Sequence, residues 1–125
     1  MTAINGPADV ASEWSKAFAN KDLGAMMELF EPDAIWVSDD GTVVEGLDSI
    51  REVFADFLAL GAVFNAETPQ IIETAGIALV CSRWTVRGEG ADGTAIDIAG
   101  RTADVMRRGS DGRWRYLIDA PYAGA

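Results

Sequence analysis

Residues 101–122, RTADVMRRGSDGRWRYLIDAPY, contain two segments in which apolar residues alternate with others, on either side of GSDG at 109–112. Gly and Asp are typical of a tight turn, and apolar residues at every second position are typical of a half-buried strand. The stretch therefore predicts an antiparallel hairpin near the end of the chain. A turn at GSDG pairs Arg108 with Arg113, which sets the register of the hairpin.

This register divides the hairpin into two faces, because successive side chains of a strand point in opposite directions. One face is expected to look into the protein and carries Thr102, Asp104, Met106, Arg115, Leu117 and Asp119. The opposite, convex face carries Ala103, Val105, Arg107, Trp114, Tyr116 and Ile118. Both faces contain apolar residues, so we expect both to be covered.

Turns before the hairpin separate further strand segments. The β-type segments span residues 62–73, 77–87, 94–108 and 113–119. Pro69 has no N–H to donate to a sheet, so the first segment is expected to be an edge strand or to be bulged there.

The first half of the chain has the apolar spacing of helices, with a short strand at 34–37. A first helix is predicted from Pro7 to about Asn20, a second one before Pro32, and a third one from about Asp48. Three helices followed by hairpins predict a single α+β domain over all 125 residues, with the helices packed on one face of an antiparallel sheet.

The composition of the chain argues against several classes of function. The formal net charge is −10, and the chain has one cysteine and no histidine. So acidic a chain lacks the basic surface that attracts nucleic acids. Without histidine there is no imidazole base or ligand, so we expect neither a Ser/His/Asp site nor a metal, and no nicotinamide motif is present.

No segment has the length and hydropathy of a membrane helix, and the start of the chain does not resemble a secretory signal. A single cysteine fits a reducing compartment. We therefore expect a cytoplasmic protein with no membrane contact.

Four stretches carry a family resemblance: WSKAFANKDLGAMMELF at 14–30, PDAIWVSDDG at 32–41, EGLDSIREVF at 45–54, and the terminal hairpin. In this order they resemble the SnoaL-like and ketosteroid-isomerase-homologue branch of the nuclear-transport-factor-2-like superfamily. The resemblance implies that family's cone-shaped, cystatin-like fold, in which the helices and the curved sheet enclose a pocket. It implies no particular activity, because the fold hosts many.

In isomerases of this fold an aspartate moves the proton, while a tyrosine and a protonated aspartate bind the developing oxyanion. By the resemblance, the tyrosine falls on Trp14, a supporting tyrosine on Phe54 and the base on Ser38. Asp39 and Asp40 follow Ser38, but Asp-Gly is also ordinary turn chemistry. Only the protonated aspartate finds a matching residue, Asp104, so steroid isomerisation by that mechanism is not expected.

Asp104 and Asp119 are therefore the candidate catalytic residues, since a carboxyl group among aromatic residues has its pKa raised and suits a general acid. Alternatively, each is neutralised by an arginine such as Arg101 or Arg115, or caps a backbone group, and is only structural. The candidate pocket residues are Trp14, Phe18, Phe30, Ser38, Phe54, Phe57, Trp84, Thr102, Met106, Arg115 and Leu117.

Two functions remain open. One is metal-free isomerase, cyclase or lyase chemistry on an apolar, ring-containing molecule, and no cofactor is expected for it. The other is a module that binds a ligand or dimerises without catalysis. In both cases we expect a homodimer through the convex face of the sheet, because exposed apolar patches usually mark interfaces.

Overall fold

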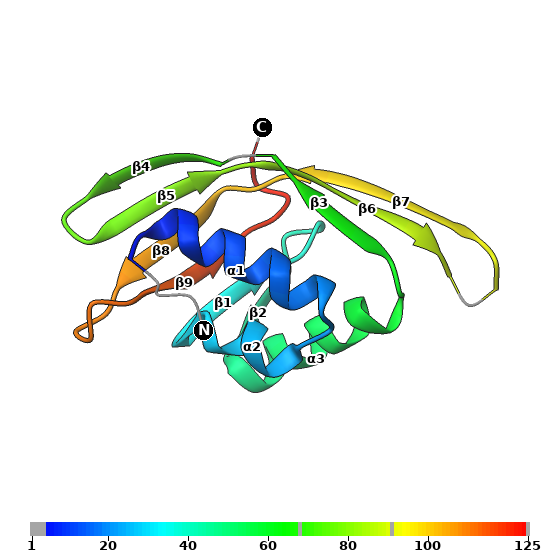
Figure 1. Ribbon diagram of the computed structural model, residues 1–125, viewed down its shortest axis with the longest axis horizontal. Coiled ribbons are helices and arrows are strands. Elements are labelled where there is room, and N and C mark those ends of the chain that lie inside the picture. Colours follow the sequence, from blue (N-terminus) through cyan, green and yellow to red (C-terminus); the bar gives the residue numbers. More distant parts are fainter. Residues whose placement is uncertain (1–4, 68, 91, 125) are drawn as a thin grey trace.

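The computed structural model describes residues 5–67, 69–90 and 92–124. The three predicted helices are present: α1 spans Pro7–Ala19, α2 spans Leu23–Glu28 and α3 spans Leu47–Ala59. They lie together beneath an arch of long strands (Figure 1). The α+β class with three helices is therefore confirmed.

Local chemistry explains the ends of the helices. Pro7 occupies the first position of α1, where its missing N–H costs nothing. The Asp22 side chain caps α2 by accepting a hydrogen bond from the N–H of Ala25 at 3.1 Å. Helix α3 begins after Gly46 and is followed by Gly61, and both glycines have positive φ angles, 86° and 66°.

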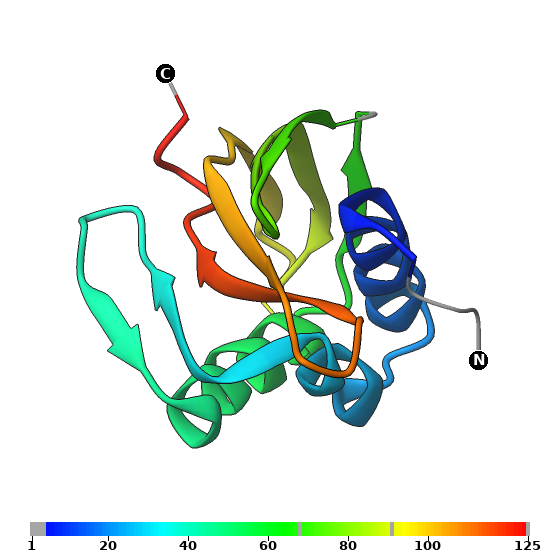
Figure 2. The same ribbon diagram turned by 90° about the vertical axis from the view of Figure 1, so that its left-hand side faces the viewer.

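Nine strands form two sheets. The strands are β1 Phe30–Val37, β2 Val43–Glu45, β3 Val63–Ala66, β4 Gln70–Thr74, β5 Ile77–Cys81, β6 Arg83–Glu89, β7 Ala95–Arg101, β8 Asp104–Arg108 and β9 Trp114–Asp119. The larger sheet has the order β2-β1-β9-β8-β5-β4, and the smaller one has the order β3-β6-β7. Figure 2 shows how strongly these strands curve.

Each long strand segment predicted from the sequence is divided where the chain passes between the two sheets. The first one breaks around Pro69 and leaves β4 as an edge strand. The other two break at Ser82 and at residues 102–103. These breaks lie side by side, because the N–H of Thr102 donates to the Ser82 carbonyl at 2.8 Å and the N–H of Ser82 donates to Thr102 Oγ1 at 2.9 Å.

The sheet is not wholly antiparallel, which corrects the prediction. Strand β1 runs parallel to β9, so a strand from the first half of the chain pairs with the last strand. It also begins at Phe30, ahead of Pro32, whereas the sequence predicted a strand only at 34–37. The pairing with β9 shifts register between Phe30 and Ile35, and Pro32 lies within this bulge.

The predicted register of the last hairpin is wrong by one residue. Arg108 pairs with Trp114 and Met106 pairs with Tyr116, so Trp114 and Tyr116 share the inner face with Met106. The pairing then shifts, so that Val105 pairs with Ile118. Leu117 is the extra residue of this bulge, and it brings Tyr116 and the later Asp119 onto the same face.

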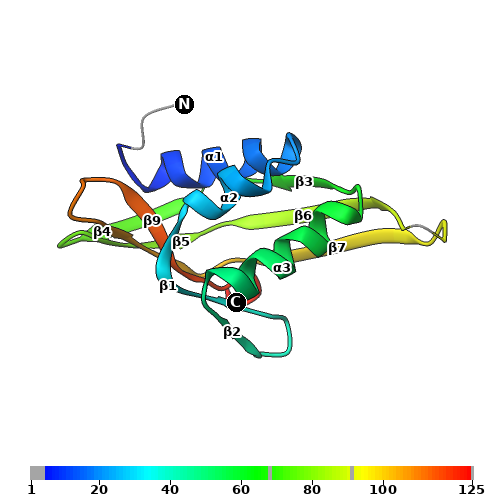
Figure 3. The same cartoon turned by 90° about the horizontal axis from the view of Figure 1, so that it is seen from below.

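The core lies between the helices and the concave side of the sheets (Figure 3). Its largest fully buried side chains come from all three helices and from β8: Val10, Met26, Ile50, Phe54 and Met106. Trp114 and Tyr116 also belong to this core, so they cannot form part of an exposed convex patch. In the described part of the chain, no helix has the length and hydropathy needed to cross a membrane.

Candidate functional site

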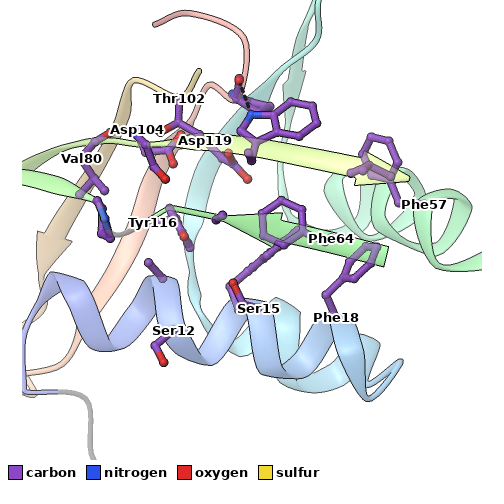
Figure 4. A pocket seen from close by; sticks show the side chains of 18 of the residues that line it. Ser12, Ser15, Phe18, Phe57, Phe64, Val80, Thr102, Asp104, Tyr116 and Asp119 are labelled. Atoms are coloured by element: carbon purple, nitrogen blue, oxygen red, sulfur yellow. Dashed lines mark hydrogen bonds between the residues drawn. The ribbon is translucent and has the colours of Figure 1, made fainter. Parts of the chain in front are cut away.

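A cavity of about 460 Å³ opens between α1, α3 and the concave faces of both sheets. Figure 4 shows the side chains that line it. The volume is in the range of small-molecule pockets. The position of the cavity follows from the fold, because the two sheets diverge at residues 82 and 102 and the helices cover only part of the space between them.

Nine aromatic residues line the cavity: Trp14, Phe18, Trp36, Phe54, Phe57, Phe64, Trp84, Tyr116 and Tyr122. Many of them pack on one another. Trp14 contacts Phe64 at a centroid distance of 4.9 Å and Phe18 at 5.5 Å. The wall is thus built mainly for apolar contact.

The two tryptophans differ in the partners of their ring nitrogens. Trp84 Nε1 donates to the Pro121 carbonyl at 2.7 Å, which fixes that ring against the tail of the chain. Trp14 Nε1 is buried and finds no acceptor in the described part of the chain.

The carboxyl groups of Asp104 and Asp119 lie next to each other in this wall (Figure 4). They come from neighbouring strands, β8 and β9, and the bulge at Leu117 places them opposite each other. Both are buried, with 5% and 8% of their surface exposed. The two carboxyl groups are hydrogen-bonded to each other, and Asp104 Oδ1 also accepts from the N–H of Ala120 at 2.8 Å.

Burial dominates the electrostatics of this pair. Removal from water raises the pKa of Asp104 to about 6, although the hydrogen bonds from Ala120 and Asp119 lower it. Burial, followed by the charge of Asp104, raises the pKa of Asp119 well above its ordinary value. Since two adjacent buried carboxylates repel each other, Asp119 keeps its proton at neutral pH and donates it in a hydrogen bond to Asp104.

Tyr116 adds a third polar group to the same side of the cavity. Only 6% of the residue is exposed, and its hydroxyl makes no hydrogen bond to any described residue. Burial raises the pKa of this hydroxyl well above its ordinary value, and the nearby charges of Asp104 and Asp119 raise it further. Tyr116 therefore stays protonated and offers an unused hydroxyl.

Eight of the predicted site residues line the cavity: Trp14, Phe18, Phe54, Phe57, Trp84, Thr102, Asp104 and Asp119. Neither aspartate forms an ion pair with an arginine among the described residues, so neutralisation by an arginine is wrong for both. Asp104 does accept a hydrogen bond from a backbone N–H, that of Ala120, as the backbone-capping alternative predicted. Two further predicted residues, Phe30 and Met106, are buried in the core but do not line the cavity.

Three predicted pocket residues lie elsewhere. Arg115 points away from the cavity and forms an ion pair with Asp111 at 2.6 Å, because the true register reverses its face. Leu117 is the bulge residue of β9. The Ser38 hydroxyl donates to Asp40 within the turn after β1, and Asp40 also accepts from the N–H of Thr42. The turn interpretation of this acidic segment agrees with these bonds.

Four aromatic residues that line the cavity were not among the site residues predicted from the sequence. Tyr116 was assigned to the opposite face, because the register deduced from the turn was wrong by one residue. Trp36 could have been found from strand alternation, since Ala34 and Trp36 are the buried residues at alternate positions of β1. Phe64 is the one residue of β3 that is not exposed, and Tyr122 follows the last strand, where alternation gives no signal.

Metal-ligating side chains do not gather at this site. Within the described ranges, no group of three or more His, Cys, Asp or Glu residues could hold a metal ion.

Comparison with known proteins gave the following findings. The model of the SnoaL-like domain matches residues 11–117. A search of curated proteins found no match.

Among solved structures, a ketosteroid isomerase-like protein from Erwinia carotovora atroseptica SCRI1043 is similar with a TM-score of 0.78 and 18% identity, over 90% of this chain and 88% of that one. A candidate dehydratase of the NTF2-like family from Streptomyces avermitilis is similar with a TM-score of 0.76 and 17% identity, over 92% and 93%.

An uncharacterised protein with a cystatin-like fold from Caulobacter vibrioides has a TM-score of 0.78 and 20% identity, over 91% of this chain and 84% of that one. At such identities, these likenesses establish the cystatin-like fold and leave the chemistry to the site itself.

Proposed function

Because the chain belongs to the SnoaL-like domain family, we propose that its cavity binds a small apolar, ring-containing molecule and that Asp104 and Asp119 exchange protons with it. The reaction class is that of an isomerase, cyclase or lyase. The observation that carries the proposal is a hydrogen-bonded pair of buried carboxyl groups in an otherwise mostly aromatic cavity.

The pair has the properties of an acid and a base held side by side. Asp119 carries the proton at neutral pH, and Asp104, with a pKa of about 6, is mostly ionised there. A base works best with a pKa close to the working pH, and a neighbouring protonated acid can donate to a developing oxyanion. The open cavity in front of the pair leaves room for a reacting molecule.

A second candidate, binding without catalysis, is favoured by the position of Ser38. The isomerases that this chain resembles need a base at that position. In this chain the position is Ser38, which lies in a turn and donates a hydrogen bond from its hydroxyl to Asp40. Together with Trp14 and Phe54 at the tyrosine positions, this leaves the carboxyl pair without the partners of that mechanism.

The test is a screen of small enone and polyketide-like compounds, first for binding and then for turnover. Binding is followed by the quenching of tryptophan fluorescence, which Trp14 and Trp84 should report from the cavity wall. We expect turnover to fall at least about 100-fold in Asp104→Asn, as for loss of a general acid or base. The exposed Asp56→Asn on α3 is the matched control. Binding without turnover by the parent would leave the non-catalytic function, and unchanged turnover in Asp104→Asn would contradict the proposed role of Asp104.

We also propose that the protein is a homodimer joined through the convex face of the larger sheet. The residues differ from those expected from the sequence, since Trp114 and Tyr116 face inward. The cross-strand pairs form one apolar row on the outer face, through Ile72, Leu79, Val105, Ile118 and Ile35. Residence in the cytoplasm likewise stays a prediction.

A further inference from the structure

The charges around the cavity are unbalanced. Two acidic residues, Asp104 and Asp119, lie at its buried side, and the exposed Glu67 lines it as well. Among the described lining residues, Lys16 is the only basic one. Its side chain is 61% exposed and lies 3.4 Å from Glu13, so it reaches toward solvent rather than toward the buried pair.

The carboxyl pair therefore holds a negative charge that no described basic side chain neutralises. One proton bound between two carboxyl groups leaves a net charge of −1 on the pair. In the described part of the chain, this negative charge is stabilised by the hydrogen bond from the Ala120 N–H and by the proton that the two carboxyl groups share. A buried charge without a counter-charge is costly, so a cation brought into the cavity would be stabilised there.

The wall suits a cation in two further ways. Aromatic faces carry a negative partial charge and attract cations, and Trp84, Phe64 and Tyr116 line the space in front of the pair. The Tyr116 hydroxyl makes no hydrogen bond to a described residue and can accept one from a molecule in the cavity. Two carboxyl groups and one hydroxyl thus offer three groups of acceptors, and a primary ammonium group has three N–H donors.

We propose that the natural ligand class of this cavity is a protonated organic amine attached to an apolar ring, with its ammonium group on Asp104, Asp119 and Tyr116 and its ring among the aromatic residues. This inference rests on the proposed function, because it names the ligand of the same cavity. An anionic ligand is disfavoured, since it would meet the negative pair without a cation to bind it. A neutral alcohol or ketone of the same shape would fill the aromatic part but leave the charge unbalanced.

The experiment compares three probes that share one ring: 2-naphthylmethylamine, 2-naphthylmethanol and 2-naphthoate. Their dissociation constants are measured by titration calorimetry on the full chain at pH 7.5. We expect the amine to bind at least about tenfold more tightly than the alcohol, and the naphthoate to bind most weakly. This comparison uses only the parent protein, so it does not depend on the folding of a variant.

The double variant Asp104→Asn/Asp119→Asn then removes the charge of the pair but keeps its shape and polarity. It should lower the affinity for the amine at least about tenfold and change that for the alcohol less than about threefold. The matched control, Glu52→Gln/Asp56→Asn, removes two carboxylates from the exposed surface of α3 and should leave both affinities unchanged.

Two results would overturn the inference while the proposed function stands. The first is an alcohol or a naphthoate that binds the parent as tightly as the amine does. The second is a double variant that keeps its affinity for the amine while its circular dichroism matches the parent's. If none of the three probes binds, both the inference and the proposed binding function fail.

Discussion

Replacing Asp104 with asparagine should change how the stability of the protein depends on pH. The amide has nearly the same shape as the carboxyl group, and its oxygen can still accept the hydrogen bond from the N–H of Ala120, now at 2.8 Å. The amide cannot ionise, however. The substitution therefore isolates the energetic cost of a buried charge.

The direction and the size of this change in stability follow from the pKa of Asp104. Burial raises the pKa of Asp104 from 3.8 to about 6, so the folded protein binds this proton more tightly than the unfolded chain does. The stabilisation from the bound proton is complete below the unfolded pKa and is lost as the pH rises through the folded pKa. At about 1.4 kcal/mol per pH unit, the whole loss is about 3 kcal/mol, of which about 1.4 kcal/mol falls between pH 5 and pH 7.5.

The assay is urea denaturation of the parent and Asp104→Asn at pH 5 and pH 7.5, both above the sequence pI of about 4.2. Between these values the free energy of unfolding of the variant should rise by about 1.4 kcal/mol relative to that of the parent. Asp56→Asn, exposed on α3, controls for the loss of one charge. A relative change within about 0.5 kcal/mol, the usual range of surface substitutions, would refute a raised pKa at Asp104.

Three further substitutions test the packing and the proposed dimer. In Gly100→Ala the new Cβ would lie 2.6 Å from the Trp84 ring and 2.9 Å from the Pro121 carbonyl, so urea denaturation should show a loss of about 1–3 kcal/mol. Phe54→Ala empties a fully buried site, and its unfolding free energy should fall by about 3–5 kcal/mol. Leu79→Glu, on the outer face of β5, should turn the proposed dimer into a folded monomer by light scattering, and a monomeric parent would contradict that proposal.

Sequence patterns predicted the helices and the fold class because their signals are local. Pro7 and Gly61 mark helix boundaries, and apolar spacing marks the inner faces. The aromatic residues that line the cavity from helices were found in the same way: Trp14, Phe18, Phe54 and Phe57.

The errors came from features that local patterns do not encode. The turn closes at Gly109 and Arg113, so the register deduced from GSDG was wrong by one residue and misplaced Arg115 and Tyr116. The bulge at Leu117 then reverses the faces beyond it, and no local pattern announces it. The parallel pairing of β1 with β9 joins segments about 80 residues apart, and no turn sequence announces it. Asp104 and Asp119 were still identified, although they were paired with the wrong partners.

Both proposals rest on Asp104 and Asp119 forming one buried pair that shares a proton beside an open cavity. The most direct measurement is a titration of the aspartate side-chain carboxyl resonances by ¹³C NMR, assigned with Asp104→Asn and Asp119→Asn. We expect the Asp119 carboxyl to stay protonated at pH 7 and Asp104 to titrate with a pKa of about 6. Two carboxyl groups that both ionise near pH 4, as exposed aspartates do, would contradict it.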